Sequence, residues 1–481
     1  MITTHISHVF LAGDRVLKLK RAVRLPYADF STLELRKAAC QRELALNRRT
    51  APELYKRVVA VTRDASGRID LGSAGEAIDW LVEMRAFDQS QLLDRLAKQG
   101  PLPSGVARNL GDTIAAFHDK AEVAGGFGGA DAIAGIIAGN AEAFAACPSG
   151  IFDPEAIATL TQGCERALAL QRGLLESRRA RGAVKECHGD LHLGNICLID
   201  GRPVLFDCLE FDERLSNIDV LYDLAFLLMD LRAHGLAGDA NIVLNRYLDR
   251  RDEVEGLAAM PLFMAVRAAI RAHVTITRNH AAGQEAKAYL SAAFDILRLV
   301  GPRLIAIGGL SGSGKSTAAY RLAPSIGAAP GGRVIRSDVI RKRLFGVSPE
   351  TALPADTYTL EVTGRVYRSM LDEATKCLAA GHSAILDAVY LRRDERDAVA
   401  DVARKAKVPF AGIWLEAPAA VLEQRIAGRR NDASDADAAV LRKQLEIDPG
   451  RLDWTPIDAA NGSDTVVAIA QCAKAERISG R

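Results

Sequence analysis

A glycine-rich segment in the last third of the chain places the strongest constraint on its fold. Gly309 to Ser316 fit the spacing G-x-x-x-x-G-K-[ST], an apolar stretch at 304–307 precedes them, and Thr317–Leu322 continue in a helical pattern. Glycines let successive backbone N–H groups turn toward a phosphate, and the N-terminus of the following helix adds positive potential. The order of strand, glycine-rich turn and helix therefore predicts a phosphate-binding loop in an α/β domain.

The members of this loop have separate expected roles. Lys315 is expected to reach the β- and γ-phosphate oxygens of a nucleotide and to act in transfer, and Ser316 is expected to ligate Mg2+. A chance Gly-Ser turn is the alternative, but the flanking strand and helix argue against it. The predicted nucleotide-binding residues are Gly309, Leu310, Ser311, Gly312, Ser313, Gly314, Lys315, Ser316 and Thr317.

Two predicted strands downstream, Arg333–Asp338 and His382–Asp387, end in carboxylates. The carboxyl ends of parallel strands converge on the ligand crevice, so both groups should face the transferring phosphate. We assign Asp338 to the acceptor hydroxyl and Asp387 to the metal, as a Walker-B-like acid. The alternative is that each aspartate only caps the helix that follows.

An arginine-rich helix follows these strands and precedes a polar, acidic loop. Arg425 and Arg429 lie four residues apart, hence on one helical face. Such a segment suits a lid over a triphosphate, and Arg429, nearer the loop, is the predicted transition-state arginine. A solvated charged face is the alternative.

A second set of phosphate-handling residues lies earlier in the chain. His188-Gly-Asp-Leu-His-Leu-Gly-Asn195 has the catalytic-loop pattern H-x-D-x-x-x-x-N, in which Asp190 accepts a hydroxyl proton and Asn195 binds Mg2+. Asp207, after the predicted strand Pro203–Phe206, would be the other metal ligand. The H-G-D-x-H-x-x-N form with its later F-D resembles the aminoglycoside phosphotransferase and choline kinase branch of the protein-kinase-like fold. His188 and His192 are expected to brace the loop.

That resemblance extends to the N-terminal segment. His8–Lys20 reads as a hairpin with Gly13-Asp14 at its tip, and Lys18 and Lys20 point to one face of its second strand. Lys18 is the preferred partner of the α- and β-phosphates and of Glu43, which lies in the helical segment Leu33–Arg48. The stretch ending at Met84 resembles the connection between lobes that meets adenine. No glycine-rich loop precedes the lysine strand. Three explanations are open: an upstream strand is missing, this subgroup binds the phosphate in another way, or the domain has lost its phosphoryl-transfer activity.

The C-terminal residues resemble the P-loop kinase family that includes polynucleotide kinase, gluconate kinase and zeta-type toxin kinases, over about 303–460. In its polynucleotide kinases an R-x-D-x-x-R-like segment positions and deprotonates a hydroxyl, and Arg336, Asp338 and Arg341 match that spacing. The whole order resembles bacterial fusions of an aminoglycoside-phosphotransferase-like domain with a P-loop domain.

This resemblance implies two domains. The first, at 1–300, is α+β and protein-kinase-like, with a small lobe at about 1–84 and a large lobe at about 85–300. The second, at 303–481, is an α/β P-loop kinase with a parallel sheet. A predicted helix at Ala286–Val300, ended by Gly301-Pro302, marks the boundary.

The functional expectation is an ATP- and Mg2+-dependent phosphotransferase. Its partners would be a nucleotide and an unidentified hydroxyl acceptor, either a small molecule or a nucleic-acid end. The alternative is an ATP-sensing regulator in which a pseudokinase N-terminal domain controls the P-loop domain or a partner. The oligomeric state is left open.

Composition narrows these expectations only slightly. The net charge of +2 does not indicate a polynucleotide substrate. No signal peptide or long apolar run is evident, so we expect a cytoplasmic protein without a membrane partner. Arg267, Arg271 and Arg278 are interpreted as a solvated helix face, in preference to a substrate-facing basic patch. The acids at 210, 212 and 213 offer only a modest cluster for a polycation.

Overall fold

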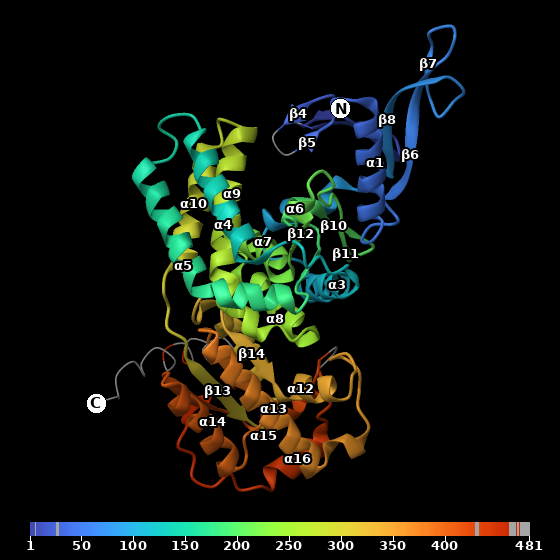
Figure 1. The fold of residues 1–481 in the computed structure, drawn as a ribbon. Coiled ribbons are helices and arrows are strands. Elements are labelled where there is room, and N and C mark those ends of the chain that lie inside the picture. The colour runs from blue at the N-terminus through green and yellow to red at the C-terminus, as the bar shows by residue number, and fades with distance from the viewer. Residues whose placement is uncertain (5, 26–27, 429–431, 461–467, 469–470, 472–481) are drawn as a thin grey trace. The chain divides into compact units, whose positions relative to one another are not determined.

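The computed structural model describes residues 1–481 except 5, 26–27, 429–431, 461–467, 469–470 and 472–481. The chain divides into two compact units, each built from two stretches of sequence (Figure 1). Unit 1 comprises Met1–Leu236 and Val266–Ser291, and unit 2 comprises Ala237–Ala265 and Ala292–Arg481.

The small lobe of unit 1 is a six-stranded sheet in the order β1-β2-β3-β8-β6-β7, with every pairing antiparallel. The predicted hairpin is confirmed, because Ala12 pairs with Arg15 on either side of the Gly13-Asp14 turn. The predicted helix after it is also confirmed. The elements of this lobe are β1 Ile2–Thr3, β2 Ser7–Ala12, β3 Arg15–Lys20, β4 Arg24–Leu25, β5 Ala28–Asp29, α1 Leu33–Asn47, β6 Tyr55–Arg63, β7 Ile69–Leu71 and β8 Glu76–Arg85.

The large lobe of unit 1 is mostly helical, with short strands that carry the catalytic-loop motif. The β10–β11 hairpin pairs Ile196 with Leu205, which brings the segments on either side of it together. The elements are η1 Gln89–Gln91, α2 Leu93–Ala97, α3 Val106–Lys120, α4 Gly129–Ala145, α5 Pro154–Ala180, β9 Val184–Glu186, η2 Leu193–Asn195, β10 Ile196–Ile199, β11 Arg202–Leu205, α6 Glu213–Ser216, β12 Asn217–Asp219, α7 Val220–Ala233, α9 Met260–Arg278 and α10 Gly283–Leu297.

Unit 2 contains a five-stranded, all-parallel sheet in the order β14-β15-β13-β16-β17. This confirms the α/β class, and the central strand β13 is fully buried, as its apolar sequence predicts. The elements are α8 Ala237–Arg250, η3 Val254–Ala259, β13 Leu304–Gly309, α11 Lys315–Leu322, η4 Ala323–Ser325, β14 Arg333–Arg336, α12 Ser337–Leu344, η5 Ala355–Tyr358, α13 Leu360–Ala379, β15 Ala384–Asp387, α14 Arg393–Ala406, β16 Phe410–Glu416, α15 Ala419–Ala427, α16 Ala438–Leu445 and β17 Thr455–Asp458.

Helix α8 packs with the P-loop sheet, although it precedes the expected boundary by more than fifty residues. The Oδ1 atom of Asn245 accepts a hydrogen bond from the Val334 N–H at 2.7 Å, and Asn241 donates to the Gly332 carbonyl at 3.0 Å. Buried Arg333 lies 2.7 Å from Asp249 and 2.8 Å from Glu373 of α13. Since β14 is an edge strand, α8 satisfies backbone groups that the sheet leaves unpaired.

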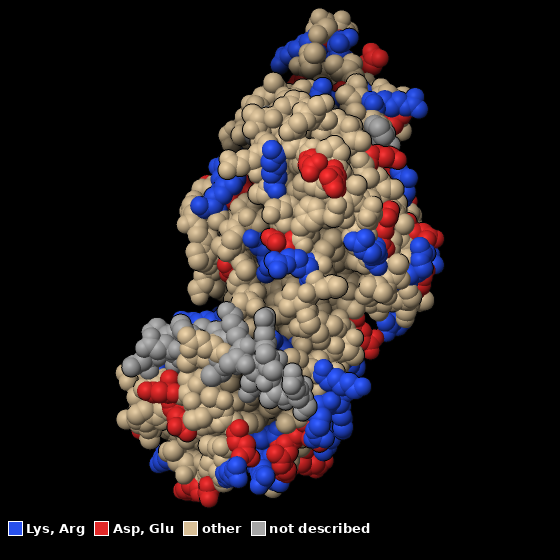
Figure 2. Space-filling view, turned by 90° about the vertical axis from the view of Figure 1, so that its left-hand side faces the viewer, with Lys and Arg blue, Asp and Glu red and all other residues tan. Residues whose placement is uncertain are grey.

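One helical stretch, Val254–Arg278, is long and apolar enough to cross a membrane, which the sequence analysis did not anticipate. However, 67% of its apolar window is buried inside the structure, as in the core helices of soluble proteins, so it is weak evidence of a span. Figure 2 shows lysines and arginines interspersed with carboxylates on the face drawn, in keeping with the small net charge.

Candidate active sites

The P-loop requires glycine at two positions for steric reasons. Gly309 and Gly312 have φ of 133° and 86°. A Cβ atom would lie 2.5 Å from the Leu415 carbonyl oxygen at the first position and 2.6 Å from the Leu422 carbonyl oxygen at the second. The loop therefore needs glycine to pass so close to its neighbours and to present its backbone to a ligand.

Two polar side chains contact this loop. The Nζ of Lys315 donates to the carbonyls of Gly309 at 2.8 Å and Leu310 at 3.0 Å. The N–H of Ser311 donates to Oε1 of Gln444, on α16, at 2.9 Å. Sequence analysis missed Gln444, which no motif marks and which lies 133 residues from its partner.

The ends of β14 and β15 converge on the first turn of α11. The Ser316 hydroxyl donates to Oδ2 of Asp387 at 2.5 Å, and Nε of Arg336 lies 3.3 Å from the same oxygen. Arg336 also pairs with Asp432 at 2.6 Å. The two predicted metal residues are thus adjacent, and a hydroxyl beside a carboxylate is a donor set that suits Mg2+.

Asp338 lies in the first turn of α12, so the expectation that it ends a strand is wrong by two residues. Strand β14 ends at Arg336, because Ser337 and Asp338 favour the N-terminal turn of a helix. Burial raises the pKa of the Asp338 carboxyl and Asp387 raises it further, whereas Arg336 and Lys315 oppose the rise.

Two predicted arginines remain, Arg341 and Arg429. Arg341 donates to the Thr357 carbonyl at 2.9 Å and to Oγ1 of Thr363 at 3.2 Å, and its guanidinium lies 4.7 Å from the Tyr358 ring. Arg429 lies outside the described residues. A cavity of about 870 Å³ is lined by Lys315, Ser316, Asp338, Arg341, Asp387 and Gln444, among others.

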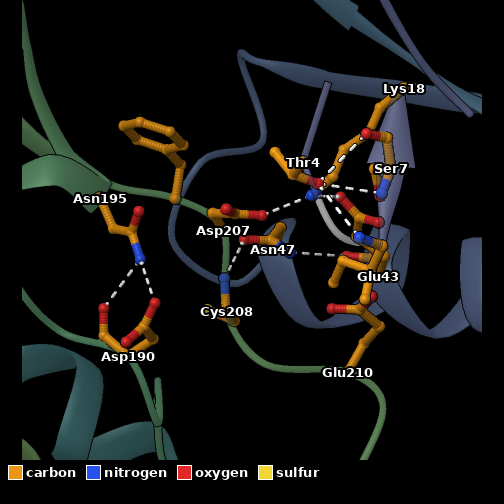
Figure 3. Close-up of polar contacts among 12 residues, drawn as sticks. Thr4, Ser7, Lys18, Glu43, Asn47, Asp190, Asn195, Asp207, Cys208 and Glu210 are labelled. Atoms are coloured by element: carbon orange, nitrogen blue, oxygen red, sulfur yellow. Dashed lines mark hydrogen bonds and ion pairs between the residues drawn. The ribbon is translucent and has the colours of Figure 1, made fainter. Parts of the chain in front are cut away.

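In unit 1, the structure brings the predicted lysine and glutamate together (Figure 3). Nζ of Lys18 lies 2.8 Å from Oε1 of Glu43 and 2.5 Å from Oδ1 of Asp207. Nζ of Lys20 lies 2.5 Å from Oε2 of Glu43 and also pairs with Glu210. Although burial alone would raise the pKa of Glu43, the two lysines lower it to about 2. Glu210 is therefore engaged in a buried ion pair, which corrects its assignment to an acidic surface cluster.

The catalytic loop is held by hydrogen bonds to its backbone. Asp223 of α7 accepts from the N–H groups of His188 at 3.2 Å and Gly189 at 2.9 Å. His188 itself donates from Nε2 to the Phe206 carbonyl at 2.9 Å, so it braces the loop. Nδ2 of Asn195 donates to Oδ2 of Asp190 at 2.9 Å (Figure 3).

The charges around Asp190 keep it ionised. Burial alone would raise its pKa, but His192, His188 and Arg278 lower it below the usual aspartate value. Asp207 adopts a left-handed backbone conformation with φ of 64°. Its carboxylate and the Asn195 amide are oxygen donors of the kind that Mg2+ takes.

The turn between β1 and β2 stands where a glycine-rich loop was sought. Thr4 donates from its N–H to the Ser7 carbonyl at 2.8 Å, and the Ser7 N–H donates to Oγ1 of Thr4 at 2.9 Å. Ser7 pairs with Lys20 in the ladder, so their side chains share one face of the sheet. A strand therefore does precede the hairpin, and a short polar turn joins the two.

Met84 lies inside β8, in register with Val16 on one side and Tyr55 on the other. The strand continues to Arg85, so the predicted connection between the lobes begins later than the sequence suggested. Met84 is also buried in an apolar cluster with Val16 and Val82. Its assignment to the lobe connection is corrected accordingly.

Two family models match the chain. The first, described as a phosphotransferase enzyme family, matches residues 13–260, which is more than half of the 481 residues. The chain belongs to the phosphotransferase enzyme family. The second model, described as an AAA domain, matches residues 304–447. This member of the phosphotransferase family thus joins a kinase-like domain to a P-loop domain.

The family member also has relatives that span both domains. Uncharacterised proteins of Mycobacterium tuberculosis (strain ATCC 25618 / H37Rv), Rv2004c, and Mycobacterium bovis, Mb2027c, are each 29% identical over 466 residues. Each match covers 94% of this chain and 91% of the relative.

Solved structures resemble the two halves separately. A gluconokinase from Sinorhizobium meliloti 1021 is 24% identical, covering 37% of this chain and 90% of its own, with a TM-score of 0.24. A choline/ethanolamine kinase family protein from Mesorhizobium loti is 15% identical, covering 61% and 84%, with a TM-score of 0.35. The Mycobacterium tuberculosis APS kinase CysC in complex with AMPPNP and APS is 19% identical, covering 36% and 95%, with a TM-score of 0.27.

Proposed function

We propose that this protein is a cytoplasmic, ATP- and Mg2+-dependent phosphotransferase whose P-loop unit transfers the γ-phosphoryl group to a hydroxyl of a small molecule or a nucleic-acid end. One observation carries the proposal. Lys315, the Ser316–Asp387 pair and Asp338 line the same cavity, although they come from three separate strand ends. A phosphate cradle, a metal-type donor set and a buried carboxylate are the parts that phosphoryl transfer needs.

In this reaction Asp338 accepts the proton of the acceptor hydroxyl. Its raised pKa makes it a stronger base than an ordinary aspartate. Lys315 stabilises negative charge on the β- and γ-phosphates, and the backbone N–H groups of 311–316 orient them. Ser316 and Asp387 would hold Mg2+, which neutralises phosphate charge when bound.

Arginines complete the proposed site. Arg336 lies against Asp387 and Asp432, and Arg341 is held by Thr357 and Thr363 beside the cavity. Fixed guanidinium groups suit a phosphoryl group in transit, because their charge needs no reorganisation when the reaction occurs. Arg429 is proposed as the lid arginine from its place in the sequence alone.

We propose a parallel kinase reaction in unit 1. Asp190 is the base, Asn195 and Asp207 are the metal ligands, and the Lys18–Glu43 pair positions the nucleotide phosphates. Met84 stays a proposed nucleotide-binding residue on its resemblance to the kinase-like fold alone. The polar turn at Thr4–Ser7 takes the place of the glycine-rich loop.

The test is a screen with γ-labelled ATP against sugars, nucleosides and 5′-hydroxyl oligonucleotides, using the full-length chain. Asp338→Asn should lower transfer by the P-loop unit by about 10²–10⁴-fold and leave ATP binding unchanged. Asp397→Asn, an exposed carboxylate on α14, is the matched control and should not alter transfer. ATP binding without any labelled product in the wild-type protein would instead favour the regulatory alternative and refute the proposal.

A further inference from the structure

Helix α9 carries a row of arginines and no acid. Its sequence, Met260–Arg278, contains no aspartate or glutamate. Arg267, Arg271 and Arg278 are separated by four and seven residues, so they share one face of the helix. This face was interpreted from the sequence as solvated, which is wrong for the first two arginines, because neither side chain is exposed.

Contacts connect this face to the catalytic loop by two routes. The guanidinium of Arg267 lies 4.6 Å from the Phe226 ring, which in turn lies 5.4 Å from the ring of His192. His192 is two residues from Asp190, and its Nε2 lies 3.4 Å from that carboxylate.

The second route runs through Asp230. Nη2 of Arg271 donates to the Tyr289 hydroxyl at 3.4 Å, and Tyr289 donates to Oδ1 of Asp230 at 2.9 Å. The other oxygen of Asp230 accepts from the Leu193 N–H at 3.0 Å. Arg271 is therefore connected to the loop that holds the proposed base through two intervening residues, Tyr289 and Asp230.

Part of the hydrogen-bonding capacity of the arginines on this face is unused. Among the described residues, Nε of Arg271 and Nη2 of Arg267 are buried without a hydrogen-bond partner. Asp230, the carboxylate that acts most strongly on Arg271, already accepts hydrogen bonds from Tyr289 and Leu193. Electrostatics agree with the geometry, because the charge of Arg278 lowers the pKa of Asp190 and that of Asp190 raises the pKa of Arg271.

The acids that a cationic acceptor would need are engaged elsewhere. Glu210 is buried against Lys20, and Asp212 caps α6 and pairs with Arg214 at 2.7 Å. A polycation or a quaternary amine placed beside Asp190 would be repelled by Arg278, whose charge acts on that carboxylate. A guanidinium fork instead matches carboxylate and phosphate oxygens.

We propose that unit 1 phosphorylates an anionic acceptor, a hydroxyl compound that also bears a carboxylate or a phosphate ester, and that Arg271 and Arg278 bind that charge. The inference rests on the kinase chemistry proposed for unit 1. The acceptor oxygen forms a bond to the γ-phosphorus as the bond to the β–γ bridging oxygen breaks. The hydroxyl proton passes to Asp190, and ADP leaves with the electron pair.

The experiment uses the full-length Lys315→Ala chain, so that only unit 1 transfers label from ATP. Acceptors are offered as matched pairs, gluconate with glucose and glycerol 3-phosphate with glycerol, together with choline and kanamycin. For at least one pair, kcat/KM for the anion should be about tenfold or more higher than that for its neutral partner. A preference for gluconate indicates a carboxylate acceptor, and a preference for glycerol 3-phosphate indicates a phosphate ester.

Substitutions then assign the charge-binding role. Arg271→Gln and the more exposed Arg278→Gln should each raise KM for the anion about 10- to 100-fold with little change for the neutral partner, and Arg271→Lys should recover part of the loss. Lys287→Gln, an exposed cation on the neighbouring α10, is the matched control. Equal use of anion and neutral partner, a preference for choline or kanamycin, or equal losses for both acceptors would overturn the proposal.

A binding measurement separates this inference from the proposed chemistry. Equilibrium binding of gluconate and glycerol 3-phosphate is compared between the Lys315→Ala chain and the same chain with Arg271→Gln and Arg278→Gln. Weaker anion binding in the second chain supports the anion site even if no acceptor is phosphorylated, in which case only the kinase chemistry of unit 1 fails. Unchanged binding refutes the anion site.

Discussion

The hydroxyl of Ser316 lies 2.5 Å from Oδ2 of Asp387, which joins the first turn of α11 to the end of strand β15. We predict that Asp387→Asn raises the Mg2+ concentration for half-maximal ATP turnover about 10- to 100-fold, since a neutral amide binds the cation more weakly. Glu416→Gln, at the exposed end of strand β16 on the other side of β13, is the control. An unchanged Mg2+ requirement in Asp387→Asn would remove this residue from the metal site.

Because each unit has a proposed nucleotide site, we predict that one chain binds two nucleotides. Calorimetric titration of the wild-type chain with a non-hydrolysable ATP analogue should give two equivalents bound. Lys315→Ala and Lys18→Met should each leave one, because each lysine contacts phosphate in only one of the proposed sites. A single equivalent in the wild-type protein would show that one of the two folds no longer binds nucleotide.

Glu43 is fully buried between two lysines, so its charge supports the fold of the small lobe. We predict that Glu43→Gln lowers the free energy of unfolding by about 3–5 kcal/mol, the usual cost of breaking a buried ion pair. Urea unfolding measures the change, and Glu165→Gln, exposed on α5, should alter stability by less than about 0.5 kcal/mol.

The same residue predicts a loss of stability in acid. Its pKa falls from 4.5 to about 2 on folding, so its contribution is complete above pH 4.5 and disappears as the pH falls toward 2. Unfolding free energy measured across this range should decline less steeply in Glu43→Gln than in the wild-type protein. If the unfolding free energy depends on pH in the same way in both proteins, Glu43 is not the source of the acid sensitivity.

Asp338 and Asp190 have pKa values shifted in opposite directions, which predicts different pH profiles for the two units. The raised pKa of Asp338 means that its carboxylate protonates at a higher pH than an ordinary aspartate. In an Asp190→Asn chain only the P-loop unit is active, and as the pH is lowered its kcat/KM should begin to fall at a higher pH. In a Lys315→Ala chain only unit 1 is active, and its base Asp190 stays ionised to a lower pH. If kcat/KM falls over the same pH range in both chains, then Asp338 and Asp190 are not both the general bases of their units.

The ion pair between Arg333 and Asp249 predicts a large effect on stability. Asp249→Ala should destabilise unit 2 by about 3–5 kcal/mol, because it leaves the buried guanidinium with one carboxylate fewer. Asp252→Ala, three residues along and 83% exposed, removes only a long surface pair with Lys376 and should cost about 0–1 kcal/mol. Thermal unfolding of both variants provides the comparison.

Local motifs predicted the parts of the two sites that lie close together in sequence. The P-loop and the catalytic loop are short segments whose chemistry fixes their spacing, and the Lys18–Glu43 pair followed from the resemblance to the kinase-like fold. Gln444 could not be found in this way, because its contact with Ser311 depends on how helix α16 packs against a loop far away in the sequence. Arg271 was misjudged because charged residues on a helix are usually solvated, and only the fold shows that its side chain is half-buried.

Residues 237–265 belong to the phosphotransferase family match for most of their length, and yet they pack with the P-loop sheet. A fragment begun at residue 303 would lose Asn245 and Asp249, and with them the cover of strand β14 and a partner of Arg333. A fragment ended at residue 300 would carry α8 without the sheet that buries it. No single cut therefore separates the two units, because a cut that leaves α8 with the C-terminal piece also takes Val266–Ser291 from unit 1.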